Sequence, residues 1–158
     1  QLGPAKVILV GTRESRLEAG RRLGADHVIN VRESDPVETI MELTQGAGVD
    51  LAIECSGGAD TPQQCAQVTK RGGKILFVAF YSQPVTLDLS AVVRGDITMY
   101  TTRGEGGNNV KRAVSLAAQG RLRGAEMVSH KFALEDIAEA FQVMRERIGD
   151  PLKIVLVP

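Results

Sequence analysis

The chain has 158 residues and carries 19 basic and 19 acidic side chains, so its formal net charge is zero. A neutral chain has no electrostatic reason to bind nucleic acid or an anionic membrane, and no apolar run approaches the roughly 20 residues of a membrane helix. Two cysteines and two histidines argue against a disulfide scaffold and are typical of a reducing compartment, so we expect a cytoplasmic protein. The length predicts about one domain, and abundant glycine with few aromatic residues indicates a protein of alternating α/β type.

Residues 6–10 form a short apolar run of the kind found in a parallel strand covered on both faces, and further strand patterns follow along the chain. The predicted strands cover residues 6–10, 27–30, 49–54, 74–80, 97–102, 127–132 and 152–157.

Helix signals lie between these strands. Ser15 with Glu18 three residues later matches a capping box, and Gly24 ends that helix. Asp35 followed by Pro36 predicts the start of the next helix. Further helix patterns run from 60 to the Gly72–Gly73 pair, from 108 to 119 and from 134 to 148.

Strand and helix alternate at least three times, which predicts parallel βαβ units in a Rossmann-like, doubly wound α/β sheet. The strict alternation ends at the glycine-rich stretch 103–109. We therefore place a boundary between residues 1–104 and a C-terminal α+β segment, residues 105–158.

The turn after the first strand carries the clearest chemical signal. In a dinucleotide-binding sheet an acidic residue at this place holds the 2′-hydroxyl of the adenosine ribose, whereas a nearby arginine accommodates a 2′-phosphate. Gly11 would take the acidic position, and Arg13 and Arg16 follow it. A charge-assisted arginine–phosphate contact of roughly 1.5–3 kcal/mol would favour NADP over NAD about ten- to a hundredfold. Alternatively, the two arginines are solvated residues in the first turn of a helix.

Several motifs, taken in order, resemble the coenzyme half of the medium-chain dehydrogenases, the superfamily of zinc-dependent alcohol, sorbitol and threonine dehydrogenases. They are Gly11–Arg13, Leu23–Asp26, Val49–Asp50, Glu54–Gly57, Gly72–Ile75 and Val78–Phe80, followed by Val128–Phe132, Glu135–Ile137, Glu139–Phe141 and Lys153–Leu156. The resemblance covers essentially the whole chain. The Glu54–Gly57 stretch favours the alcohol and polyol branch over the zinc-free quinone reductases.

The resemblance implies a binding site for NADP or NAD. At the adenosine ribose we expect Gly11, Thr12, Arg13 and Arg16, and beside the nicotinamide-side ribose we expect Cys55 and Ser56. The backbone of Val78, Ala79 and Phe80 would lie near the nicotinamide amide. Lys153 would reach the pyrophosphate, and Arg103, after the fifth strand, would also contact the coenzyme. Ala79 stands where the family usually has glycine, which implies tighter packing there.

Other parts of the family pattern do not occur in these 158 residues. They are the glycine-rich turn that binds the pyrophosphate, the strand before it, and the catalytic zinc ligands. Residues 1–3 resemble the tail of the helix that follows that turn. We therefore expect that this chain contains no catalytic residue, binds no metal and is inactive when alone. We expect zinc in the intact parent protein.

The missing strand would lie between strands 6–10 and 49–54 in a sheet of order 3-2-1-4-5-6. Its absence would leave both neighbours without hydrogen-bond partners, at a cost of about 1–3 kcal/mol for each buried group. We therefore expect a longer polypeptide, direct pairing of these two strands, or a swapped segment that fills the gap.

Together these features predict a fragment of a zinc-dependent dehydrogenase that transfers hydride between a small secondary alcohol and a nicotinamide coenzyme. A non-catalytic nucleotide-binding or dimerisation module, and the zinc-free quinone reductase branch, remain alternatives. The weakly charged strand Ile97–Thr102 is suited to edge pairing, so we expect a homodimer formed through it.

Overall fold

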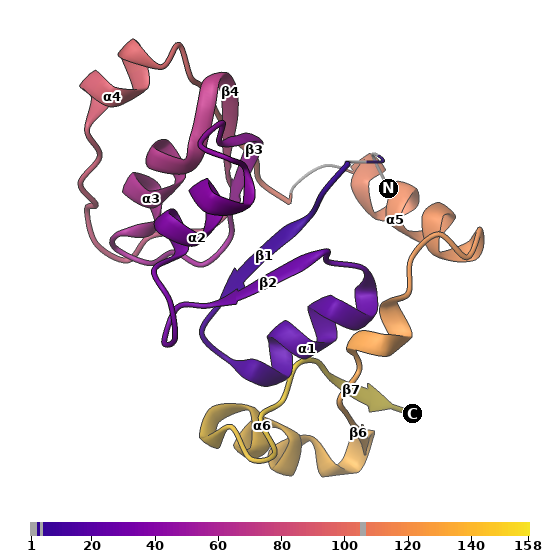
Figure 1. Cartoon of the computed structure of the whole chain (residues 1–158). Coiled ribbons are helices and arrows are strands. Elements are labelled where there is room, and N and C mark those ends of the chain that lie inside the picture. The colour runs from indigo at the N-terminus through magenta and orange to yellow at the C-terminus, as the bar shows by residue number, and fades with distance from the viewer. Residues whose placement is uncertain (1–2, 4, 105–106) are drawn as a thin grey trace. The chain divides into compact units, whose positions relative to one another are not determined.

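The protein is built from parallel strands joined by helices (Figure 1). The computed structural model describes residues 3, 5–104 and 107–158. Contacts divide the chain into two compact units, Gln1–Val31 with Gly106–Pro158 as unit 1 and Arg32–Glu105 as unit 2. The expected helix tail at 1–3 and the expected boundary between 104 and 105 fall at least partly outside the described residues. The division into 1–104 and 105–158 stays a prediction.

Unit 1 begins with a βαβ motif. Strands β1 (Ile8–Gly11) and β2 (His27–Asn30) pair in parallel, and helix α1 (Glu14–Leu23) connects them. Leu17 and Ile29 are buried between the helix and the strands. At Gly24 the backbone takes the left-handed conformation, with a φ of 105°, and closes the last turn of α1 as predicted.

The C-terminal part of unit 1 forms a second parallel pair. It contains α5 (Gly107–Ala118), the 3₁₀ turn η1 (Gly124–Met127), β6 (His130–Ala133), the 3₁₀ turn η2 (Leu134–Asp136), α6 (Ile137–Glu146) and β7 (Ile154–Val157). Strand β6 pairs with β7 in parallel, and α6 packs on both. Because η1 occupies residues 124–127, the strand expected to start at 127 starts at His130 instead.

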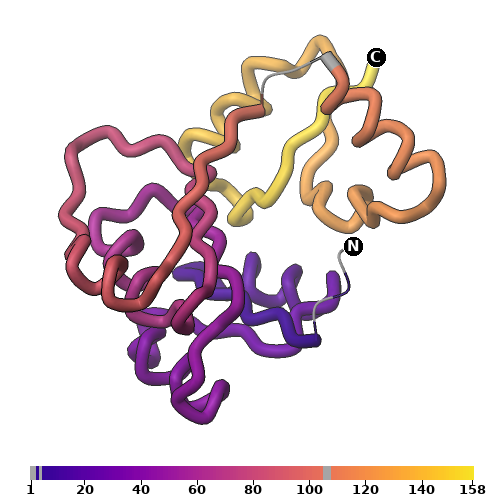
Figure 2. Tube along the Cα trace, turned by 90° about the horizontal axis from the view of Figure 1, so that it is seen from above, coloured from indigo at the N-terminus to yellow at the C-terminus, as the bar shows by residue number. Residues whose placement is uncertain are grey.

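Unit 2 is a three-stranded parallel sheet in the order β3-β4-β5. Its elements are α2 (Pro36–Leu43), β3 (Val49–Glu54), α3 (Thr61–Val68), β4 (Thr69–Phe77), α4 (Leu89–Arg94) and β5 (Thr98–Thr101). After β4 the chain leaves the sheet through residues 78–88 and α4, and β5 then returns beside β4, a path that can be followed in Figure 2.

The core of unit 2 lies between the sheet and helices α3 and α4. Ile75 is completely buried there, packed with Ala52, Ala66 and Val92. On the opposite side of β3, Leu51 and Ile53 remain exposed. Side chains alternate between the two faces along β3, so Glu54 points to the same side as Ala52.

The expected start of α1 and the expected end of α3 are wrong. The residue that caps α1 is Arg13, and the hydroxyl of Ser15 bonds to Asp150 instead of forming a capping box with Glu18. Helix α3 ends at Val68 rather than at the Gly72–Gly73 pair, because β4 already pairs with β3 from residue 69. The register of that pairing shifts after Val49, and the glycine pair lies inside the irregular stretch.

Every ladder is parallel, as the predicted Rossmann-like α/β class requires. In the part of the chain that the structure describes, the ladders join β1 to β2, β3 to β4 to β5, and β6 to β7. Within unit 1, β1 pairs with β2, and within unit 2, β3 pairs with β4. The three expectations for the missing strand stay predictions.

Candidate functional site

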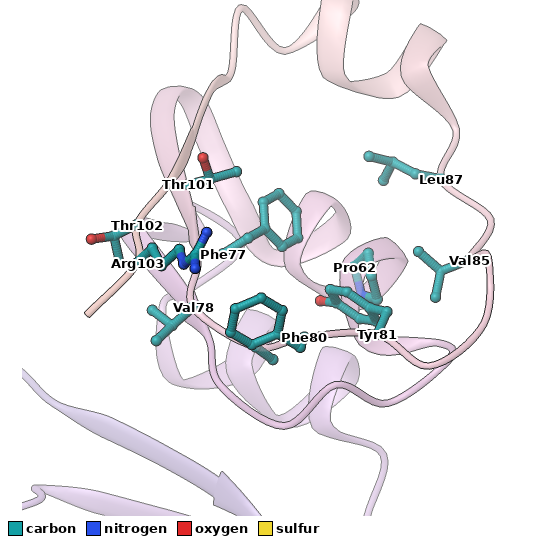
Figure 3. A pocket seen from close by; sticks show the side chains of 11 residues that line it. Pro62, Phe77, Val78, Phe80, Tyr81, Val85, Leu87, Thr101, Thr102 and Arg103 are labelled. Atoms are coloured by element: carbon teal, nitrogen blue, oxygen red, sulfur yellow. The ribbon is translucent and has the colours of Figure 1, made fainter. Parts of the chain in front are cut away.

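The carboxyl ends of β3, β4 and β5 meet at one edge of the unit 2 sheet, where an open pocket of about 700 Å³ lies. Figure 3 shows Thr102 and Arg103 on one side of this pocket and Pro62 and Tyr81 on the other. The predicted residues Val78, Ala79, Phe80 and Arg103 all line it. In open parallel α/β sheets, ligands bind outside the carboxyl ends of the strands.

A buried carboxylate accepts hydrogen bonds from several segments at this edge. Glu54, the last residue of β3, is only 3% exposed. Its Oε1 atom accepts hydrogen bonds from the Ser56 N–H at 2.8 Å, the Ser56 hydroxyl at 2.6 Å and the Thr61 hydroxyl at 2.9 Å. The Gly57 N–H donates to the same oxygen at 3.1 Å, and the Tyr81 hydroxyl donates to Oε2 at 2.5 Å. One side chain thus ties together three segments: the turn after β3, the start of α3 and the loop after β4.

These donors keep Glu54 ionised. Burial alone would raise the pKa of the carboxyl, but the hydrogen bonds from Ser56, Tyr81 and Thr61 outweigh it and lower the pKa from 4.5 to about 2. Burial and the bond to the Glu54 carboxylate raise the pKa of the Tyr81 hydroxyl, so Tyr81 acts as a donor.

The neighbouring thiols are correspondingly unreactive. Burial and the charge of Glu54 raise the pKa of Cys55, and the same two causes raise that of Cys65 to about 11. Both thiols stay protonated at neutral pH, and both cysteines are free of disulfides.

The turn after β3 and the loop after β4 approach each other closely. The N–H groups of Val78 and Ala79 donate to the Glu54 carbonyl at 2.9 and 3.3 Å. Gly57 has a φ of +70°, and a Cβ atom on it would lie 2.9 Å from the Phe80 carbonyl oxygen. Only glycine fits this position without displacing backbone. The structure therefore brings the predicted residues Cys55, Ser56 and Val78–Phe80 together.

The predicted adenosine-side residues lie in unit 1. Gly11 ends β1, the exposed Thr12 follows it, and Arg13 and Arg16 lie at the start of α1. The Arg13 guanidinium forms an ion pair with Asp150, with Nη1 and Oδ1 separated by 2.6 Å. Arg13 is therefore partnered by a carboxylate, whereas Arg16 is exposed.

Lys153 also belongs to unit 1 and is exposed just before β7. Its backbone N–H and that of Leu152 donate to the Ser129 hydroxyl at 3.2 and 2.9 Å, which anchors the segment that follows Asp150. Lys153 and the turn at Gly11 thus belong to the same unit.

Sequence reasoning missed Glu54, Tyr81 and Asp150 as site residues. For Glu54 a signal was available, since a carboxylate on the same strand face as the apolar Ala52, at the carboxyl end of the strand, needs buried hydrogen-bond donors. For Tyr81 and Asp150 no local pattern exists, because their partners lie 27 and 137 residues away along the chain.

The described residues provide neither a metal site nor a membrane-spanning helix. Within residues 3, 5–104 and 107–158, no three His, Cys, Asp or Glu side chains lie close enough to hold an ion, so a zinc ion does not fit them. The helices in the same part of the chain are too short or too polar to cross a membrane.

Parallel strands with helical crossovers and a pocket at their carboxyl edge define a Rossmann-like α/β fold. Among known protein families, the model of the zinc-binding dehydrogenases matches residues 2–119 of this chain. The chain belongs to this zinc-binding dehydrogenase family.

Relatives extend the match to the whole chain. An alcohol dehydrogenase from Cupriavidus necator is 34% identical over 159 residues, which are 99% of this chain and 43% of the relative. L-threonine 3-dehydrogenase from Bacillus licheniformis is 30% identical over 158 residues, which are 99% of this chain and 45% of the relative.

Solved structures agree in fold. Benzyl alcohol dehydrogenase from Acinetobacter calcoaceticus matches with a TM-score of 0.84 and 30% identity, over 98% of this chain and 43% of that chain. The chain therefore spans less than half the length of the relatives that it resembles.

Replacing Glu54 by Gln tests the buried carboxylate. The pKa of Glu54 is about 2 in the folded protein and 4.5 in the unfolded reference, so ionisation stabilises the fold by roughly 3 kcal/mol above about pH 4.5. This contribution is lost as the pH falls from about 4.5 towards 2. In urea unfolding, Glu54→Gln should lower the free energy of unfolding by about that amount at neutral pH, and its difference from the wild type should shrink below about pH 4.5.

Glu42→Gln on the exposed side of α2 is the matched control and should change stability little at any pH. A Glu54→Gln difference that stayed constant from neutral to acidic pH would show that the ionised carboxylate is not the stabilising species.

Proposed function

We propose that this chain is the coenzyme-binding part of a dehydrogenase that uses a nicotinamide dinucleotide. One observation carries the proposal: the turn held by Glu54 and the loop Val78–Phe80 meet at the carboxyl edge of a parallel sheet, beside an open pocket. When bound, the coenzyme supplies hydride transfer. The protein supplies the binding surface and its orientation.

At the nicotinamide end, the residues fit a ligand that has both a polar sugar and a flat ring. Phe77, Val78 and Phe80 give the pocket apolar walls. Ser56 would lie beside the nicotinamide-side ribose, while its hydroxyl remains held by Glu54 at 2.6 Å. The backbone of Val78–Phe80 would lie near the nicotinamide amide. Arg103, on the other side of the pocket, adds the positive charge that a phosphorylated ligand favours.

At the adenosine end, the turn from Gly11 to Arg16 would contact the adenine ribose, and Lys153 would reach the pyrophosphate. Gly11 offers no carboxylate to repel a 2′-phosphate, and Arg13 and Arg16 offer guanidinium groups, which supports NADP as coenzyme. NAD remains the alternative, because Arg13 already pairs with Asp150.

For the whole protein we propose oxidation or reduction of a small secondary alcohol, the reaction type named in relatives such as the alcohol dehydrogenase of Cupriavidus necator. The zinc ion of such an enzyme would need ligands other than the described residues of this chain. The chain alone would then be inactive. A cytoplasmic location, suggested by two free cysteines, belongs to the same proposal.

Coenzyme titration of the full-length protein tests this function and its coenzyme preference. NADPH and NADH should both bind measurably, and Arg13→Ala should raise the Kd for NADPH about tenfold or more while changing that for NADH less than about threefold. The substitution removes the guanidinium and leaves the charge of Asp150 uncompensated, and both changes disfavour a 2′-phosphate. Arg22→Ala, which removes an exposed arginine from the same helix, is the control.

An equal loss for both coenzymes, or no change for either, would remove the role of Arg13 at the 2′-phosphate. Failure of the wild type to bind either coenzyme would favour a non-catalytic module instead.

We further propose that two copies pair through β5. One edge of β5 bonds to β4, the other forms no ladder within the described residues, and Met99 and Tyr100 are exposed. Light scattering of the full-length protein should give a dimer, and Tyr100→Lys should shift it towards the monomer, because a lysine on an edge strand opposes strand addition. A monomeric wild type would contradict this interface.

A further inference from the structure

The carboxylate of Asp150 lies against the turn that follows β1. Its Oδ1 atom accepts a hydrogen bond from Arg13 Nη1 at 2.6 Å, and its Oδ2 atom accepts one from the Ser15 hydroxyl. The Arg13 side chain is 16% exposed and that of Asp150 is 41% exposed. The carboxylate is therefore the more accessible partner, and it puts a negative charge at the turn where Gly11 lacks one.

The loop after α6 holds this carboxylate in place. Arg147, Gly149 and Asp150 all adopt positive φ angles, of 57°, 69° and 49°. The Asp150 N–H donates to the Arg147 carbonyl at 3.0 Å, and two residues further on the Leu152 N–H donates to the Ser129 hydroxyl at 2.9 Å. Aspartate tolerates the left-handed conformation better than most residues. The backbone on both sides thus fixes the position of the charge.

The carboxylate retains acceptor capacity after these contacts. Two carboxylate oxygens offer about four acceptor positions, and Arg13 and Ser15 use one on each oxygen. A ribose 2′-hydroxyl can donate to a remaining position. A 2′-phosphate has no hydrogen to donate when fully ionised. It would also bring up to two negative charges close to the Asp150 carboxylate, which already pairs with Arg13.

We propose that Asp150 is a coenzyme-specificity residue: from the C-terminal segment it supplies the carboxylate that the end of β1 lacks, and so favours a 2′-hydroxyl over a 2′-phosphate. The inference rests on the proposed function, in which the turn from Gly11 to Arg16 binds the adenosine ribose. Arg13 and Asp150 then act in opposite directions on the choice between NADP and NAD. The preference of the protein is the balance between the two side chains.

The test measures the Kd values of NADPH and NADH by coenzyme fluorescence in the full-length protein. Asp150→Asn removes the charge and keeps the shape, while Asp150→Gly removes the side chain, and both residues are compatible with the positive φ at this position. Either variant should raise the ratio Kd(NADH)/Kd(NADPH) about tenfold, largely through tighter NADPH binding. Glu139→Gln on α6 removes the same charge from an exposed position in unit 1 and should change this ratio less than about twofold.

Two results would show that Asp150 does not set the coenzyme preference. If both Asp150 variants unfold at the wild-type temperature, bind both coenzymes and leave the ratio within about twofold of wild type, Asp150 does not set specificity. An equal shift in Glu139→Gln would also overturn the inference, since the effect would then follow net charge alone. If the wild type binds neither coenzyme, the proposed function itself fails and this inference falls with it.

Discussion

The buried carboxylate of Glu54 is the constraint on which the candidate site depends. A charge at the end of a strand can be buried only if hydrogen-bond donors replace the water that it loses. Ser56, Gly57, Thr61 and Tyr81 provide these donors. The hydrogen bonds to the Glu54 carboxylate hold the turn after β3 against the loop after β4. The N–H groups of Val78 and Ala79 also donate to the Glu54 carbonyl, so the same residue positions the edge of the pocket.

The two predicted ends of the coenzyme site are built on different electrostatic principles. At the nicotinamide end the charge is buried, its donors are neutral, and the neighbouring thiols are kept protonated. At the adenosine end the charges lie near the surface, as an ion pair between Arg13 and Asp150. A near-surface pair can exchange partners at modest cost, whereas a buried network cannot. We therefore propose that the first end fixes the binding geometry and that the second end discriminates between the two coenzymes.

Much of the fold could be predicted from local patterns. Strands β2 and β3 have the predicted limits, and Asp35 caps α2 as predicted, with its carboxylate accepting from two backbone N–H groups. The start of β4 could not be found in this way, because pairing with β3 overrides the glycine pair that suggested a helix end. The contacts of Asp150 could not be predicted either, since they join residues more than 130 positions apart in the chain.

The central claim is that the carboxyl edge of β3-β4-β5 binds the nicotinamide half of a dinucleotide. The most direct measurement is a crystal structure of the full-length protein with the reduced coenzyme bound. The account predicts the nicotinamide-side ribose next to Ser56 and the carboxamide within hydrogen-bond distance of the backbone of Val78–Phe80. A coenzyme bound elsewhere, with this pocket left to solvent, would contradict it.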